Sequence, residues 1–134
     1  MKFTQETDYA FRVVHTFAEL GPESYLTALE MSEKGSIPYR FLLRVLSKLK
    51  KAGIVASRQG VDGGYRLGRA PENISLRDVV IAVEGDVRIN RCLKDMSLCN
   101  ANNAPECRVH QTLAAIQERF LNDLDKYTFN NLEG

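Results

Sequence analysis

The sequence predicts a mainly α-helical protein with one small β-hairpin and a long helix near its C-terminal end. Three observations favour this fold class. Apolar residues recur every three or four positions in several stretches, which is the period of an amphipathic helix. A polar, glycine-rich segment at residues 57–64 separates two short apolar segments, as in a hairpin. The 134 residues, 44% of them hydrophobic, suffice for one domain with a buried core.

Two helices are expected at the start of the chain. Thr4 can cap the first helix, whose apolar stripe over residues 10–18 ends before Gly21. Thr27 and Glu30 have the spacing of a capping box, in which each side chain bonds the backbone N–H of the other. This pair predicts the start of a short second helix.

A third helix is expected directly after the second, which Gly35 is predicted to stop. The third helix is predicted to begin at residues 36–38, with Pro38 in its first turn, and to end at Gly53. Its apolar stripe, predicted to be buried, consists of Phe41, Leu42, Val45, Leu46 and Leu49.

The second half of the chain begins with the hairpin, whose expected strands are residues 54–56 and 65–67. Another helix is expected after Ser75, which has capping-box spacing to Asp78. Residues 85–108 show no clear period and contain every cysteine of the chain.

The last predicted helix follows from apolar residues at steps of three and four. This stripe consists of Leu113, Ile116, Phe120 and Leu124. Such steps fit a seam between two helices, and they also fit packing of the helix on its own domain.

Charge is strongly segregated along the chain, although the formal net charge is only +1. Residues 1–35 contain three basic and six acidic side chains. Residues 36–69 contain eight basic and one acidic side chain, and residues 70–134 contain seven basic and ten acidic side chains. A concentrated basic block is typical of a phosphate-binding surface. A short helix, a turn, a longer helix and a hairpin form the order of a winged helix-turn-helix. We therefore expect a DNA-binding domain over residues 1–84.

The third helix is the predicted recognition helix. Four cations of this helix lie opposite the apolar stripe, on a face about 16 Å long: Arg40, Arg44, Lys48 and Lys51. There they can displace counterions from DNA phosphates. The N-terminal end of a recognition helix normally meets base edges in the major groove. The predicted DNA contacts in this helix and the hairpin are Pro38, Tyr39, Arg40, Arg44, Lys48, Lys51, Arg58, Gln59, Gly60 and Gly63.

The three cysteines, Cys92, Cys99 and Cys107, fall within 16 residues, which favours a metal or redox role. Thiolates suit iron–sulfur clusters, zinc and Cu(I), and structural zinc usually uses a closer cysteine pair than any present here. Reduced cysteines without a ligand and a thiol–disulfide switch are the alternatives. A four-ligand site needs one more residue, and the candidates are His110, close in sequence, and Asp8, supplied by a dimer partner. Asp95 and Glu106 are also near the cysteines in the sequence. A helix-capping role for His110 and dipole compensation by Asp8 are the simpler interpretations of these two residues.

Other classes of function lack support in the sequence. No nucleophile–base pair, phosphate-binding loop or paired acid motif is present, so we expect no enzymatic activity. No apolar run approaches the roughly 20 residues of a membrane span, and the first eight residues contain no apolar signal region. We therefore expect a cytoplasmic protein without a membrane partner.

Together these features resemble the IscR/NsrR-type winged-helix iron–sulfur regulators of bacteria, over essentially the whole chain. The segments that carry the resemblance are residues 1–4, 8–10, 46–55, 63–67, 75–78 and 82–85, together with the three cysteines. Their order and spacing are specific, although each alone is a weak signal.

The resemblance implies a homodimer with paired C-terminal helices over residues 109–134, and an iron–sulfur cluster, 2Fe-2S or 4Fe-4S, in each cysteine segment over residues 85–108. The three cysteines match ligands of the family. His110 matches the histidine used in IscR-like members, and Asp8 matches the aspartate used across the dimer in NsrR-like members. Leu43 departs from the family, since IscR-like members can place a base-reading Glu there.

Gln59 also departs from the family, because a wing arginine is frequent at its position. We therefore do not expect the operator of IscR-like members.

The expected function is a dimeric DNA-binding regulator, a repressor, whose cluster senses nitric oxide, iron supply or redox state. The alternative is a thiol–disulfide or zinc-dependent winged-helix regulator that uses the same cysteines.

Overall fold

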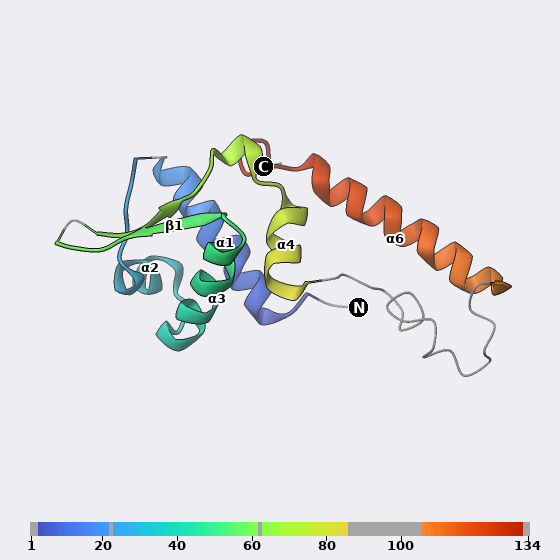
Figure 1. Cartoon of the computed structure of the whole chain (residues 1–134), viewed down its shortest axis with the longest axis horizontal. Coiled ribbons are helices and arrows are strands. Elements are labelled where there is room, and N and C mark those ends of the chain that lie inside the picture. The colour runs from blue at the N-terminus through green and yellow to red at the C-terminus, as the bar shows by residue number, and fades with distance from the viewer. Residues whose placement is uncertain (1–2, 22, 62, 86–105, 133–134) are drawn as a thin grey trace.

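The computed structural model describes residues 3–21, 23–61, 63–85 and 106–132 (Figure 1). Cys92 and Cys99 lie outside these residues. The elements are α1 (Gln5–Leu20), α2 (Ala28–Gly35), α3 (Tyr39–Lys51), β1 (Val55–Arg58), β2 (Gly64–Leu67), the 3-10 helix η1 (Pro71–Asn73), α4 (Leu76–Glu84) and α6 (Arg108–Lys126). The predicted fold class, mainly helical with a small hairpin and a long C-terminal helix, is confirmed. Among the helices described, none has the length and apolar character needed to span a membrane.

The helix starts follow the predicted capping residues. The side-chain oxygen of Thr4 caps α1, and complete capping boxes open α2, from Thr27 and Glu30, and α4, from Ser75 and Asp78. The backbone N–H of Thr27 donates to the carboxylate of Glu30, and this bond holds the pKa of Glu30 below its ordinary value. Local sequence therefore determines where these three helices begin.

The boundary between α2 and α3 differs from the prediction. Gly35 belongs to α2, and the left-handed residue after the helix is Ser36, at φ 52°. Pro38 caps α3 from outside the helix instead of lying in its first turn. Phe41 was predicted to be buried, and this prediction is wrong because its side chain is 41% exposed. Phe41 lies at the edge of the buried face of α3, with its ring 6.1 Å from the ring of Tyr9.

The hydrophobic core forms around α1, which packs against α3 and α4. The hairpin strands lie beside α1 and α3, as Figure 1 shows, and contribute Val55 and Leu67 to the same core. The largest fully buried side chains are Phe17, Met31, Leu42, Leu46, Leu49, Ile54 and Ile74. This core holds α3 with its apolar stripe inward and its polar side outward.

The hairpin formed by β1 and β2, here called the wing, is antiparallel, and its register runs from Val55 opposite Leu67 to Arg58 opposite Gly64. A residue that precedes α2 extends this small sheet. Leu26 and Tyr65 exchange two backbone hydrogen bonds, at 2.9 and 2.7 Å. Gly64 is required at this approach, because its φ is 136° and a Cβ there would lie 2.6 Å from the carbonyl oxygen of Leu26.

α6 extends away from the domain on the side opposite the wing (Figure 1). The chain after α6 returns to the domain, where the N–H of Leu76 donates to Tyr127 and the N–H of Phe129 donates to Ile74. The side chain of Phe129 is only 6% exposed and belongs to the main core. The segment that follows the long helix is therefore part of the same hydrophobic core as residues 9–83.

Candidate nucleic-acid interface and metal ligands

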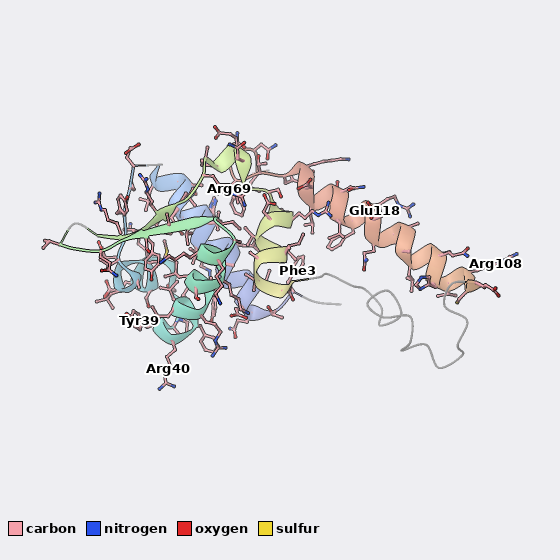
Figure 2. All side chains as sticks on the ribbon, viewed as in Figure 1. Phe3, Tyr39, Arg40, Arg69, Arg108 and Glu118 are labelled. Carbon is pink, nitrogen blue, oxygen red and sulfur yellow. The ribbon has the colours of Figure 1, made fainter. Side chains whose placement is uncertain are left out.

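α3 presents three cations together on its free side. Arg40, Arg44 and Lys51 are all exposed, and their helical positions lie opposite the buried stripe. Figure 2 shows Arg40 pointing away from the body of the domain at the beginning of α3, next to Tyr39. We call Arg40, Arg44 and Lys51 the basic face. Its long, mobile charges can neutralise phosphates along a groove of double-stranded DNA.

Lys48 is not brought together with these three residues. Its Nζ lies 3.0 Å from Oε2 of Glu6 on α1 and 3.3 Å from the carbonyl oxygen of Val83 on α4. The Lys48 side chain is 37% exposed. The sequence spacing predicts that Lys48 shares one side of the helix with the basic face. In the structure Lys48 lies at the edge of that side, where Glu6 of α1 and Val83 of α4 are its partners.

A row of rings and cations joins α3 to α1. The Cζ of Arg44 lies 5.7 Å from the ring centre of Phe41, and the Phe41 ring lies 6.1 Å from that of Tyr9. On the other side of Tyr9, the Cζ of Arg12 lies 5.3 Å from the ring centre. These contacts favour one direction of the Arg44 side chain, beside Phe41. The apolar period of α3 predicts Phe41 in the core and gives no sign of its contact with Arg44.

Arg12 connects α1 to the turn between α2 and α3. Its Nη1 donates to the carbonyl oxygens of Gly35, at 2.8 Å, and Ser36, at 3.4 Å. Its Nη2 donates to Oδ2 of Asp8 at 3.1 Å. Asp8, whose side chain is 64% exposed, therefore orients the guanidinium that holds the turn before the recognition helix.

The wing arginines pack on an aromatic ring, that of Tyr25, which no sequence pattern marks. The Cζ atoms of Arg58 and Arg66 lie 4.0 and 5.1 Å from the ring centre of Tyr25. Tyr25 directly precedes Leu26, whose pairing with Tyr65 places Tyr25 across from Arg66 in the small sheet. Only a pairing between segments distant in sequence creates this arrangement, so spacing alone could not have found it.

The remaining predicted wing residues lie at its far end. Gln59 and Gly60 are exposed, and Gly60 has a φ of 108°. Gly63 has a steric reason to be glycine, because an added Cβ would run into the backbone carbonyl of Arg58. Gly63 therefore supports the shape of the wing, and the exposed Gln59 and Gly60 present polar backbone and side-chain groups at its end.

Two of the candidate metal ligands lie together at the start of α6. Cys107 is the N-cap residue of α6 and is half-buried, and His110 lies three residues later in the first turn. Side chains three positions apart share one side of a helix, so a thiolate and an imidazole can be directed to one metal centre there. In the part of the chain that the structure describes, no group of three or more His, Cys, Asp or Glu side chains could hold a metal ion.

Asp8 lies far from this pair within one chain. It lines a pocket of about 520 Å³ with Phe11, Arg12, His15, Leu76, Phe129 and Leu132. Phe129 follows the C-terminal end of α6, whereas Cys107 precedes its N-terminal end, and a helix of 19 residues is about 28 Å long. In Figure 2, Arg108 marks the far end of α6, well away from Phe3 and the start of α1. Within one chain, therefore, His110 lies near Cys107 and Asp8 does not.

The family model of Rrf2, described as an iron-dependent transcriptional regulator, matches residues 3–133. The chain belongs to the Rrf2 family. This confirms the predicted resemblance to IscR-like regulators.

Solved structures show the same fold. IscR of T. potens is 20% identical over 97% of this chain and 84% of its own, with a TM-score of 0.76. CymR of B. subtilis, described as the global cysteine regulator, is 23% identical over 97% of this chain and 94% of its own, with a TM-score of 0.71. The oxidized form of CymR of Staphylococcus aureus is 20% identical over the full length of both chains, with a TM-score of 0.72.

Membership in the Rrf2 family establishes the class of function. The protein is a DNA-binding transcriptional regulator and not an enzyme. The basic face and the wing lie on the winged-helix part of this Rrf2 protein.

The predicted dimer stripe of this Rrf2 protein divides into two parts. Phe120 stacks on Phe3, with ring centres 6.2 Å apart, and Leu124 packs near Val80 in a small cluster of the same chain. Ile116 is 42% exposed. The stripe therefore contacts its own domain at its C-terminal end. Nearer its N-terminal end it is accessible, since Leu113 is half-buried and the neighbouring Val109 is 63% exposed.

Proposed function

We propose that this Rrf2 regulator is a homodimeric repressor whose DNA affinity depends on an iron–sulfur cluster, 2Fe-2S or 4Fe-4S, bound by each chain. Cys92, Cys99 and Cys107 are the thiolate ligands, and Asp8 of the second copy is the fourth ligand, with His110 as the competing candidate. The proposal rests on the two contacts of Arg12. Its guanidinium bonds Asp8, a candidate ligand, and it also bonds Gly35 in the turn before the recognition helix.

DNA is bound by α3 and the wing in this proposal. The basic face enters the major groove, with Pro38, Tyr39 and Arg40 at the end of α3 that meets base edges. An arginine at this end can bond guanine through two hydrogen bonds. The wing presents Arg58, Gln59, Gly60 and Gly63 to the sugar-phosphate backbone. Arg44 and Lys51 add phosphate contacts along α3.

Two copies associate through their α6 helices. The exposed part of the stripe, which includes Leu113 and Ile116, forms the seam, while Phe120 and Leu124 continue it next to the domain. Antiparallel pairing places the first turn of one α6 beside the last turn of the other. This arrangement brings the partner's Cys107 toward the pocket where Asp8 lies, across a distance that one chain alone does not bridge.

The link to DNA runs through Arg12. A carboxylate that binds iron has less negative charge to share with a guanidinium, so Asp8 holds Arg12 differently when a cluster is bound. Arg12 also holds the carbonyl oxygen of Gly35, three residues before Pro38. The position of α3 therefore depends on the state of Asp8. A signal can shift DNA affinity only through such a difference in contacts between the two states.

The cluster supplies a group that nitric oxide, iron shortage or an oxidant can alter. The alternative function is a thiol–disulfide or zinc-dependent regulator that uses the same cysteines. The likeness to CymR, whose structure is known in an oxidized form, favours this second candidate. Both candidates use the same DNA-binding surface and differ only in what the cysteine segment binds.

Anaerobic purification with an absorbance spectrum and iron and sulfide analysis tests the proposal. We expect a coloured protein with iron and sulfide in the wild type and in His110→Ala, and a lost or shifted spectrum in Asp8→Ala. A lost spectrum in His110→Ala alone would move the fourth ligand to His110. A colourless wild type, free of iron and sulfide, would overturn the proposal and favour the zinc or thiol regulator.

A further inference from the structure

We propose that Lys48 is a positioning residue that ties the recognition helix to α1 and α4, and that it does not contact DNA. This inference rests on the proposed function for its regulatory consequence. Its structural part, the absence of a phosphate contact by Lys48, is tested independently of any cluster.

The contacts of Lys48 use its charge within the protein. The ammonium lies 3.0 Å from Oε2 of Glu6 and 3.3 Å from the carbonyl oxygen of Val83. The Glu6 side chain is only 20% exposed, and its second oxygen, Oε1, is buried without a hydrogen-bond partner among the described residues. A poorly solvated carboxylate needs a compensating cation nearby, so Glu6 holds Lys48 more strongly than a surface carboxylate would.

The place of this ion pair in the fold gives it a function. Lys48 belongs to α3, Glu6 to the first turn of α1, and Val83 to the last turn of α4. Glu6 lies two residues before Asp8, and the chain leads directly from Val83 into the segment that contains the cysteines. One ammonium thus connects the DNA-reading helix to both elements from which the candidate cluster ligands extend.

Two consequences follow. A cation already neutralised by a carboxylate releases no counterion from DNA, so Lys48 contributes nothing to the salt dependence of binding. Its removal takes away the polar contact of α3 with α1 and α4 and leaves their hydrophobic packing in place, so a change at Asp8 or in the cysteine segment is transmitted less completely. Lys51 provides the matched comparison, because it lies on the same helix, carries the same charge and belongs to the basic face.

The first test measures the affinity of the purified dimer for a fluorescent 30-base-pair duplex of random sequence over a range of salt concentrations. Lys51→Met is expected to reduce the slope of log affinity against log salt by about 0.9, the value for one lost phosphate contact. Lys48→Met is expected to leave the slope unchanged. A reduction of the slope in Lys48→Met equal to that in Lys51→Met would overturn the proposal.

A charge exchange makes the test independent of a loss of stability. In Glu6→Lys/Lys48→Glu, the ion pair is reversed, and we expect the wild-type salt slope and a melting temperature higher than that of Lys48→Glu alone. If Lys48 contacted a phosphate, the exchanged protein would show a weaker salt slope, because a glutamate would face the DNA. That result would contradict a positioning role.

The regulatory part is measured with a duplex selected by the wild-type protein from a random pool. We expect Lys48→Met to bring the affinities of the cluster-loaded and cluster-free forms at least threefold closer together, with the iron content per chain unchanged. An unchanged affinity ratio in Lys48→Met would overturn the positioning role. A wild type that binds no cluster would instead overturn the proposed function, while the salt-slope result would still decide whether Lys48 contacts DNA.

Discussion

Nη1 of Arg12 lies 2.8 Å from the carbonyl oxygen of Gly35, and this hydrogen bond fastens the first helix to the turn before the recognition helix. The same guanidinium holds Asp8 at 3.1 Å. Gly35 is a buried residue, and its hydrogen bond to Arg12 is partly buried. Arg12 therefore contacts both the turn before α3 and a candidate cluster ligand.

Replacement of Arg12 tests this link. Arg12→Met removes the donor of this partly buried hydrogen bond, and we expect a loss of about 0.5–1.5 kcal/mol in the free energy of unfolding. DNA binding should weaken as well, because the turn before α3 is less firmly held. Urea unfolding and DNA titration measure the two effects. Lys50→Met, at an exposed position of α3, is the control and should change stability by less than about 0.5 kcal/mol. An equal, small effect of both variants would contradict the role of Arg12.

Tyr25 is predicted to hold the wing arginines in place. A cation–π contact is worth about 0.5–1 kcal/mol at an exposed site, so Tyr25→Leu should weaken DNA binding roughly two- to fivefold. Tyr25→Phe keeps the ring beside Arg58 and Arg66 and should retain most of the affinity. Fluorescence anisotropy at one salt concentration makes the comparison. The same loss in both variants would show that the hydroxyl group, and not the ring, matters.

The segment after α6 is predicted to stabilise the domain. Phe129→Ala removes a core side chain, and such a change typically costs about 3–5 kcal/mol in the free energy of unfolding. Leu29→Ala, at a side chain that is 60% exposed, should cost less than about 0.5 kcal/mol. Urea unfolding followed by circular dichroism compares the two. A cost for Phe129→Ala as small as that for Leu29→Ala would contradict the packing of this segment in the core.

The exposed part of the α6 stripe is predicted to form the dimer seam. Ile116→Asp places a charge in the apolar seam, and a buried unpaired charge is strongly unfavourable, so a monomer is expected at micromolar concentration. Ala115→Asp adds the same charge at a neighbouring exposed position off the stripe and should leave the dimer intact. Light scattering after size-exclusion chromatography distinguishes these outcomes. A dimer in both variants would place the seam elsewhere.

The features that the sequence predicts correctly depend on local spacing. The capping residues Thr4, Thr27 and Ser75 are identified because each bonds a backbone group within three residues. The order of helices and hairpin follows from the period of apolar residues and from the glycines. Cys107 and His110 are placed together for the same local reason, since they are three residues apart at one helix start.

The features that the sequence does not predict depend on contacts between distant segments. Phe41 and Lys48 lie at the edges of the inner face of α3, and whether an edge position is free depends on α1 and α4. Tyr25 meets the wing arginines only because Leu26 pairs with Tyr65. Phe129 enters the core because α6 leads the chain back to the domain (Figure 1), which no spacing in the sequence indicates.

The central claim is that the state of the cluster changes the affinity of the dimer for DNA. The most direct measurement compares the affinities of the anaerobically purified, cluster-loaded protein and the cluster-free protein for one selected duplex at one salt concentration. We predict a difference of at least tenfold, which corresponds to about 1.4 kcal/mol of coupling. Equal affinities of the two forms would contradict the claim.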